Sequence, residues 1–422
     1  MSGTIGSNIL SHSGTIAESA AGLNWVSDVV TASTVTVEAG NGYWINTTSN
    51  ACTITLPASA EAGDNIVIVD FARTWGTNSV TLDSNGLNFQ GNADTYTVEY
   101  TTDGQSVNLI YSDSTKGWIP LEDDVVADEP VQPPTQKAAF AYGSTGSMVS
   151  LKNLVGSNGV IAADVTGVGS ARSYLAAAGY GGDKGIFAYG TTGSRVSLKN
   201  LMGNTGTIAA DVTGVGTARD SLAASGYSDD KAIFAYGTTG SVVSLKNLVD
   251  NVGTVASDVT GVGTARRGLA AARYGSDKAV FAYGRSSGLV SLKNLVSNVG
   301  VVAADVTGVG TARIYPAAVG YGEDKAIFAF GEASSDVTGV SNLVTSVGVI
   351  GTDVSAVGTA RYALGAARYG GDKAIFGYGF LVDGSVVSMS NLVNSSGVIA
   401  SDVTGVGSAR GGIAAAEYSF SA

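Results

Sequence analysis

Short apolar runs, each broken by Gly, Asn, Asp or Ser, follow one another along most of the 422-residue chain. From residue 137 onward, four kinds of run recur in a fixed order, as in LAAARYG at 269–275, KAIFAYG at 231–237, VVSLKNLV at 242–249 and GVVAADVTGV at 300–309. Short runs rich in Val, Ile, Tyr and Phe between turn residues are typical of β-strands. Helical repeats would need apolar residues at three- and four-residue spacing, which the glycines interrupt. The pattern therefore predicts an all-β array with four strands in each repeat.

Two sequence markers give the length of the repeat. The segment DKAIFAYG, or a close variant, places its lysine at Lys137, Lys184, Lys231, Lys278, Lys325 and Lys373, with spacings of 47, 47, 47, 47 and 48 residues. The segment DVTGVGTAR, or a variant, ends in each repeat at Arg172, Arg219, Arg266, Arg313, Arg361 and Arg410. We number the repeats 1 to 6 by these lysines. Four strands in about 47 residues suit one blade of a β-propeller.

The runs at the two ends of the array indicate that it closes on itself. The array begins at Lys137 with a run of the second kind and ends at 411–420 with GGIAAAEYSF, a run of the first kind. Pairing of this last strand with repeat 1 would complete one blade and remove the open sheet edges. We therefore expect residues 137–422 to form a six-bladed β-propeller.

The order R-x-x-L-A-A-A, aromatic-Gly turn, D-K-A-I-F-A-Y-G and T-A-R resembles the kelch repeat in all six units. The kelch double glycine is replaced here by Tyr-Gly or Phe-Gly, and all four tryptophans precede Lys137, so no repeat contains the usual tryptophan. The resemblance implies a kelch-like β-propeller used for binding, and it points to no specific partner or activity.

The first third of the chain follows other patterns. Residues 34–121 carry strand runs such as NIVIVDFA and SVNLIYS between turn dipeptides such as Asn85-Gly86 and Asp103-Gly104, which predict a small β domain. Residues 122–136 form an acidic, Pro-rich segment that we expect to be an extended linker. Residues 1–33 are rich in Ser, Gly, Thr and Ala, and we expect a disordered leader that becomes ordered on a partner.

The stretch GYWINTTSNACTITLPASAEAGDNIVIVDFARTWGTNSVTLDSNG, with the later SVNLIYSDSTKGWIPL, resembles a β module of tail-fibre and other virion-appendage proteins of tailed bacteriophages. The likeness covers residues 34–121, and its core L-P-A-S-x-x-A-G-D-x-I-x-I-x-D and K-G-W end carry it. The resemblance implies a small β-sandwich-like fibre module that attaches to a virus particle. It also implies oligomerisation, often as a homotrimer.

Composition narrows the functional classes. The net charge of −12 and the pI near 4.5 disfavour nucleic acid as a partner. No run reaches the ~20 apolar residues of a bilayer span, and MSGTIGSNIL lacks the features of a signal peptide. We therefore expect synthesis in a host cytoplasm and no membrane insertion. The resemblance to the fibre module, rather than the composition, implies a place on the virion surface. The single cysteine, Cys52, excludes an intramolecular disulfide.

Catalytic chemistry finds little support. The only histidine, His12, lies in the leader, and no P-loop or metal-binding pattern is present, so we expect no catalytic residue, metal or cofactor. Each repeat places an aspartate eight residues before its arginine, at Asp164, Asp211, Asp258, Asp305, Asp353 and Asp402. These aspartates could hold a bound ion such as calcium. Residues found in every repeat more often serve the fold, and we favour hydrogen bonds to turns or ion pairs with neighbours.

Loop length singles out one face of the array. The spacing from the repeat lysine to the Asn of KNL or SNL is 16 in repeats 1 to 4, 17 at Lys325–Asn342 and 18 at Lys373–Asn391, while the other segments keep their lengths. In a four-stranded meander, the loops after the second and the fourth strand emerge on the same face. Varied loops on a constant scaffold favour recognition, with aromatic and Arg residues as anchors. The candidate receptor-binding residues are Tyr174, Arg195, Arg267, Arg285, Tyr315, Glu332, Tyr362, Phe380 and Asp383.

These observations lead to one hypothesis and two alternatives. The hypothesis is a non-enzymatic bacteriophage virion protein, a tail fibre or capsid-mounted fibre, whose N-terminal segment binds other virion proteins. Its propeller would bind a receptor on the host surface, a glycan or a protein. The first alternative is a purely structural or decoration protein of capsid or tail. The second is a glycan-active, kelch-like enzyme, which would need carboxylates gathered in one pocket.

Overall fold

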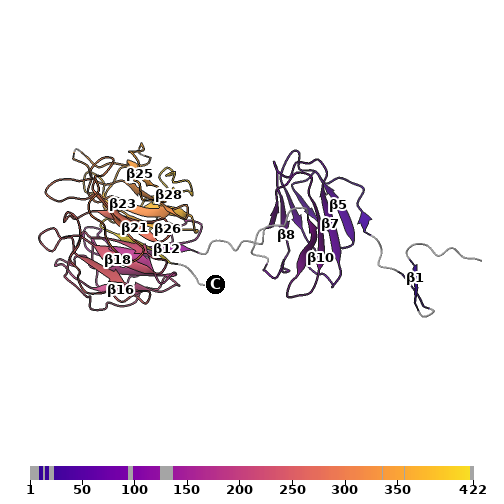
Figure 1. The fold of residues 1–422 in the computed structure, drawn as a ribbon, viewed down its shortest axis with the longest axis horizontal. Coiled ribbons are helices and arrows are strands. Elements are labelled where there is room, and N and C mark those ends of the chain that lie inside the picture. Colours follow the sequence, from indigo (N-terminus) through magenta and orange to yellow (C-terminus); the bar gives the residue numbers. More distant parts are fainter. Residues whose placement is uncertain are drawn as a thin grey trace, which may run out of the picture. The chain divides into compact units, whose positions relative to one another are not determined.

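The computed structural model describes residues 9–12, 15–18, 23–93, 98–123, 136–334, 336–355 and 357–418. Every regular element in these ranges is a β-strand, so the prediction of an all-β chain is confirmed. Within the same ranges, no helix is long and apolar enough to cross a membrane. The chain divides into an N-terminal unit, Met1–Pro133, and a C-terminal unit, Pro134–Ala422, both drawn in Figure 1.

The N-terminal unit contains two sheets around one apolar core, with strand orders β11-β10-β7-β5-β3 and β4-β6-β8-β9. The bounds are β3 Asn24–Trp25, β4 Thr34–Thr36, β5 Asn41–Ile45, β6 Cys52–Thr55, β7 Asn65–Asp70, β8 Val80–Asp83, β9 Val98–Tyr100, β10 Ser106–Tyr111 and β11 Trp118–Asp123. From β3 to β8, successive strands alternate between the two sheets. Neighbours within a sheet therefore run parallel, because each connection passes through the other sheet.

The two turn dipeptides adopt turns, yet neither closes a two-residue hairpin. Asn85 and Gly86 have φ of 54° and 86°, but β9, the antiparallel partner of β8, begins only at Val98. Asp103-Gly104 leads from β9 in one sheet to β10 in the other. The prediction of turns at these two dipeptides is therefore correct. The partners of the flanking strands, however, are set by packing between the two sheets.

Two motifs of the fibre-like module have structural roles in this unit. The buried carboxylate of Asp70 accepts hydrogen bonds from the backbone N–H groups of Thr74, Trp75 and Gly104 at 3.1, 3.2 and 2.9 Å. Gly117 has a φ of 68°, and a Cβ there would lie 1.7 Å from the carbonyl oxygen of Asn88. The K-G-W end therefore requires glycine at this position.

The leader differs from its prediction where it is described. β1 (Ile9–His12) pairs antiparallel with β2 (Thr15–Glu18), and β3 joins the five-stranded sheet, where Trp25 stacks on Trp44 with ring centroids 4.3 Å apart. These residues form strands in the structure, which the sequence analysis did not predict. Runs of two to four residues give too weak a sequence pattern to be recognised as strands.

The C-terminal unit contains six three-stranded antiparallel sheets, each with a strand of the second kind in the middle. In chain order the sheets are β29 (Ala414–Tyr418), β12 (Lys137–Ala141) and β13 (Lys152–Val155); β14 (Ala176–Tyr180), β15 (Lys184–Ala188) and β16 (Lys199–Met202); β17 (Ala223–Tyr227), β18 (Lys231–Ala235) and β19 (Lys246–Val249); β20 (Ala270–Tyr274), β21 (Lys278–Ala282) and β22 (Lys293–Val296); β23 (Ala317–Tyr321), β24 (Lys325–Ala329) and β25 (Ser341–Val344); and β26 (Gly365–Tyr369), β27 (Lys373–Gly377) and β28 (Ser390–Val393). The middle strands are buried on both faces, which explains their continuous apolar sequence KAIFA.

The fourth run of each repeat was predicted to be a strand, and this prediction is wrong. It contacts the third strand only at isolated bridges, such as Val249 with Val255 and Lys246 with Val259. The side chain of Asn247 lies between these bridges and donates from Nδ2 to the carbonyl of Ala256 at 2.9 Å. A side-chain amide thus replaces part of the backbone ladder, which a periodicity argument could not reveal.

The six sheets contact one another in a closed circuit. The first-kind strands contact in the order β14, β17, β20, β23, β26 and β29, and β29 in turn contacts β14. The expected pairing of the C-terminal strand with repeat 1 is confirmed, because β29 pairs with β12 from Lys137 opposite Tyr418 to Ala141 opposite Ala414. The first-kind strands surround a narrow cavity of about 60 Å³, and its width explains why Ala and Gly dominate these strands.

Candidate ligand-binding face

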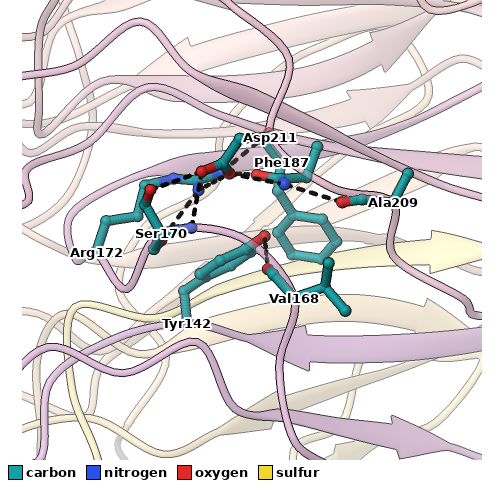
Figure 2. Close-up of polar contacts among 8 residues, drawn as sticks. Tyr142, Val168, Ser170, Arg172, Phe187, Ala209 and Asp211 are labelled. Carbon is teal, nitrogen blue, oxygen red and sulfur yellow. Dashed lines mark hydrogen bonds and ion pairs between the residues drawn. The ribbon is translucent and has the colours of Figure 1, made fainter.

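Each repeat buries one arginine against the next repeat, and Figure 2 shows the first of these contacts. Arg172 is fully buried, donates from Nη2 to Asn200 Oδ1 at 2.6 Å, and lies over the Tyr142 ring at 4.2 Å from its centroid. Asp211 accepts from Asn200 Nδ2 at 3.0 Å and from the N–H and Oγ–H of Ser170 at 2.9 and 2.6 Å. Arg172 belongs to repeat 1, whereas Asn200 and Asp211 belong to repeat 2. We call this set the arginine lock.

The arginine lock recurs at every junction between repeats. The other five arginine–asparagine contacts join Arg219 to Asn247, Arg266 to Asn294, Arg313 to Asn342, Arg361 to Asn391 and Arg410 to Asn153. The last contact, at 2.6 Å, joins repeat 6 to repeat 1, and Ser408 of repeat 6 donates to Asp164 of repeat 1. The structural interpretation of the repeated Asp and Arg is thus confirmed. In the described part of the chain, no three His, Cys, Asp or Glu side chains are grouped to hold a metal ion.

The locks keep both charges despite their burial. Partial burial raises the pKa of Asp305, but hydrogen bonds from Thr264 and Asn294 outweigh it and lower the pKa below the usual value. Burial lowers the pKa of Arg361 to about 10, so this guanidinium is still protonated at neutral pH. The repeated tyrosine of FAYG, represented by Tyr142, is buried, and its hydroxyl donates to the carbonyl of Val168 at 3.1 Å.

A ring of backbone hydrogen bonds lies next to the locks. The residues two positions after the lock arginines all have left-handed φ angles between 51° and 62°, and they are Tyr174, Ser221, Gly268, Tyr315, Ala363 and Gly412. Each donates its N–H to the carbonyl of its equivalent in the preceding repeat; Ser221 donates to Tyr174 at 2.9 Å, and Tyr174 donates to Gly412 at 2.8 Å. The left-handed conformation costs about 1–2 kcal/mol at each non-Gly position. The closed ring of hydrogen bonds explains why it is nevertheless adopted.

The two predicted loop sets lie together at this end of the C-terminal unit. The residue after each lock arginine forms an antiparallel bridge with the first residue of a loop between the second and third strands. We call these couples loop pairs, and they are Ser173–Thr191, Asp220–Thr238, Arg267–Arg285, Ile314–Glu332, Tyr362–Phe380 and Gly411–Ser144. Directly opposed side chains project to the same side of a sheet. The couple differs from sheet to sheet, and some members, such as Ser173, Thr238 and Ile314, are buried.

Four of the predicted residues form a continuous aromatic row. Ring centroids are 5.3 Å apart for Tyr174 and Tyr315, 6.3 Å for Tyr315 and Tyr362, and 5.4 Å for Tyr362 and Phe380, which stack at 29°. All four side chains are half-buried. Burial, with smaller contributions from Tyr315, Tyr362, Asp220 and Glu332, raises the pKa of Tyr174 to about 12. Tyr174 is therefore neutral at physiological pH.

A hollow of about 270 Å³ adjoins the aromatic row at Tyr362. It is lined by Glu332, Ala333, Ser334, Asp336, Val337, Tyr362 and Val382. These residues come mainly from the two lengthened loops, in repeats 5 and 6. The Glu332 carboxylate makes no hydrogen bond or ion pair with the residues that the structure describes. The hollow thus combines an aromatic wall with an available hydrogen-bond acceptor.

The remaining predicted residues lie outside the row. Arg195 pairs with Asp220, with Nε and Oδ2 3.0 Å apart. Asp383 accepts from the N–H and Oγ–H of Ser385 at 2.9 and 2.6 Å, so it stabilises its own turn, and these bonds lower its pKa. Arg267 and Arg285 oppose each other as a loop pair.

Two kinds of residue escaped the sequence analysis. Ser221 contributes a hydroxyl 3.2 Å from that of Tyr315, and nothing in its own repeat marks it. The buried asparagines of the locks had a clearer signal, because an amide recurs in every repeat within an otherwise apolar run. Their role in joining neighbouring repeats was not predicted from this pattern.

The other end of the cavity offers a weaker candidate. A hollow of about 70 Å³ there is lined by charged residues, among them Lys184, Lys231, Arg273, Arg368, Asp229 and Glu417. Several of these cations already have partners: Arg273 pairs with Asp229 at 2.7 Å, and Lys184 with Asp183 at 2.8 Å. The aromatic face therefore remains the better candidate.

Comparison with known proteins found no matching family model and no matching curated protein.

Proposed function

We propose that the C-terminal unit is a six-bladed, kelch-like β-propeller. The closed circuit of sheets, the six arginine locks and the ring of six backbone hydrogen bonds support this proposal. Each of these features joins repeat 6 to repeat 1 as it joins any two neighbours.

The chain acts, in this proposal, as a non-enzymatic virion protein of a tailed bacteriophage, a tail fibre or capsid-mounted fibre. Its N-terminal segment binds other virion proteins, and the loop face of the propeller binds a host-surface receptor, best a glycan. The aromatic row beside the 270 Å³ hollow is the observation that carries the receptor role. Half-exposed aromatic rings with a nearby acceptor suit the apolar faces and hydroxyl groups of sugar rings. The hollow is slightly below the ≈ 300 Å³ at which small-molecule pockets begin, so it suits one sugar ring.

Cell adsorption tests this role. Replacing Tyr315, Tyr362 and Phe380 together by alanine should reduce adsorption to host cells at least ten-fold, with a nearly unchanged melting temperature. The matched control replaces Val252, Val299 and Val347, which are 70–72% exposed on turns after third strands, by alanine. Undiminished adsorption by the folded aromatic variant would favour the alternative of a structural or decoration protein.

One observation favours the enzymatic alternative. Glu332 and Asp336 line the same hollow, and a pair of carboxylates is what glycoside hydrolysis needs. Asp336 Oδ1, however, accepts from the N–H of Val337 at 2.7 Å and so stabilises its own loop. Release of oligosaccharides from host polysaccharide by the full chain, abolished in Glu332→Gln, would establish an enzyme.

The N-terminal unit makes the protein a homotrimer in this proposal. The fibre-like motifs of residues 34–121 are its support. Light scattering of the full chain should give three times the 42.2 kDa of one chain. A mass of one chain at high concentration would contradict it.

A further inference from the structure

Arg267 and Arg285 are the one loop pair that carries two like charges. The N–H of Arg267 donates to the carbonyl of Arg285 at 3.0 Å, and the reverse bond is 2.9 Å long. Two residues that exchange both backbone hydrogen bonds lie directly opposite each other in an antiparallel pair. Their Cα atoms are about 5.5 Å apart, and their side chains project from the same side of the sheet. Like charges in this arrangement destabilise a sheet. A reason for keeping them is therefore expected.

Among the described residues, no carboxylate forms an ion pair with either arginine of this pair. Neither guanidinium forms an ion pair or a side-chain hydrogen bond with the residues that the structure describes. Arg195 on the same face differs, because Asp220 pairs with it at 3.0 Å. The lock arginine Arg266, one residue before Arg267, differs as well, since Asn294 accepts from it at 2.6 Å.

The pair borders the aromatic row. Gly268 directly follows Arg267, and a Cβ built on it would lie 3.1 Å from Cε1 of Tyr315. Tyr315 is the ring that connects Tyr174 to Tyr362 in the row. A ligand stacked on Tyr315 therefore lies beside the backbone segment that carries Arg267, and Arg285 lies directly opposite Arg267 in the same loop pair.

We propose that Arg267 and Arg285 together bind one oxyanion, a carboxylate or a phosphate, carried by the saccharide that stacks on the aromatic row. This inference rests on the proposed receptor role and adds the chemical class of the ligand. A guanidinium presents a planar fork of donors that matches such oxyanions, and it is less strongly hydrated than an ammonium group. The net charge of −12 opposes approach of an anionic ligand at long range. At physiological ionic strength, the repulsion from the protein's net charge is screened beyond about 8 Å. The attraction of the two nearby arginines therefore outweighs it when the anion is in contact with them.

The first test needs no receptor. Inorganic phosphate should raise the melting temperature of the full chain, because it neutralises the pair in the folded state. The double variant Arg267→Gln/Arg285→Gln should melt at a higher temperature than the wild type in low salt and should lose the response to phosphate. Arg195→Gln, whose arginine already has a partner, should respond like the wild type. Equal responses of the wild type and the double variant would overturn the proposal.

The second test compares two matched saccharides. The full chain should bind oligogalacturonate at least ten-fold more tightly than its carboxyl-reduced form, and the double variant should bind both equally. A response to phosphate without preference for oligogalacturonate would identify phosphate as the anion. Equal binding of both saccharides together with no phosphate response would overturn the inference, while the adsorption defect of the aromatic variant would still support the receptor role. If the aromatic variant adsorbs normally, the receptor role fails, and the phosphate response alone decides whether the pair holds an anion.

Discussion

The arginine locks and the loop pairs lie one residue apart in the sequence, yet they vary in opposite ways. Arg266 is fully buried and has the same kinds of partner as its five equivalents. Arg267, the next residue, is half-buried and is replaced at equivalent positions by Ser, Asp, Ile, Tyr and Gly. Residues that join repeats are therefore held constant by packing. The loop-pair residues make no contact that is common to all repeats and they differ from one repeat to the next, which favours the loop face as the place for recognition.

The largest expected effect concerns closure. Deleting residues 411–422 removes β29 and one member of the backbone ring, Gly412, together with the two ring hydrogen bonds that Gly412 makes. As a result, β12 becomes an edge strand. We expect the C-terminal unit to lose cooperative unfolding altogether, as measured by circular dichroism during heating. A control chain that ends at Tyr418 keeps β29 and should melt like the full protein. A truncated chain that melted normally would show that the circuit does not depend on its last strand.

The adjacent arginines provide the next test of the comparison. Arg266→Ala leaves Asn294 without its donor and removes a cation 4.3 Å from the Tyr236 ring, and we expect a loss of about 3–5 kcal/mol in unfolding free energy. Arg267→Ala should change stability by no more than about 0.5 kcal/mol. Urea denaturation measures both. Similar losses for the two variants would mean that locks and loop pairs do not differ energetically.

The sequence revealed the strands that every repeat contains, but it did not reveal the contacts between neighbouring repeats. The strands around Phe234 and Leu248 follow from local periodicity, and so does the pairing of the last strand with repeat 1. The contact of Arg172 with Asp211 joins residues 39 positions apart in different repeats, and no pattern within one repeat specifies it. The left-handed backbone of Tyr174 and Tyr315 likewise depends on a ring that exists only after closure.

The candidate site was predictable in part. Loop length and residue type selected Tyr315, Tyr362 and Phe380, and the structure brings their rings together. The same criteria selected Arg195 and Asp383, whose charges are already used within the fold. The sequence shows that a residue differs between repeats, but it does not show whether its charged group already forms an ion pair or hydrogen bond within the fold. In the N-terminal unit, the turn dipeptides were found, while the parallel strand partners depended on packing of two sheets.

Acid should reduce the stabilisation from the arginine locks, by less than the loss of a lock arginine does. The pKa of Asp305 is lowered in the folded state, so the unfolded chain binds protons more readily as the pH falls. The lock contribution is therefore complete above the ordinary carboxyl pKa of 3.8 and is lost as the pH drops below it, through the lowered native value. Asp305→Asn should lose about 1–2 kcal/mol at pH 7 and show a shallower decline in urea midpoint between pH 5 and pH 3.

The smallest expected effect distinguishes the role of the Tyr315 ring from that of its hydroxyl group. Tyr315→Phe removes only the contact with Ser221, whose hydroxyl lies 3.2 Å away, and it keeps the ring between Tyr174 and Tyr362. We expect a loss of at most about 1 kcal/mol in stability, because a single neutral hydrogen bond contributes little after exchange with water. Adsorption to host cells should stay within two-fold of the wild type, since stacking depends on the ring face. Tyr315→Ala leaves the backbone ring bonds in place and should cost adsorption far more than stability. If Tyr315→Phe abolished adsorption as fully as Tyr315→Ala, the hydroxyl would be the recognition element, and the aromatic row would serve the fold in the way the arginine locks do.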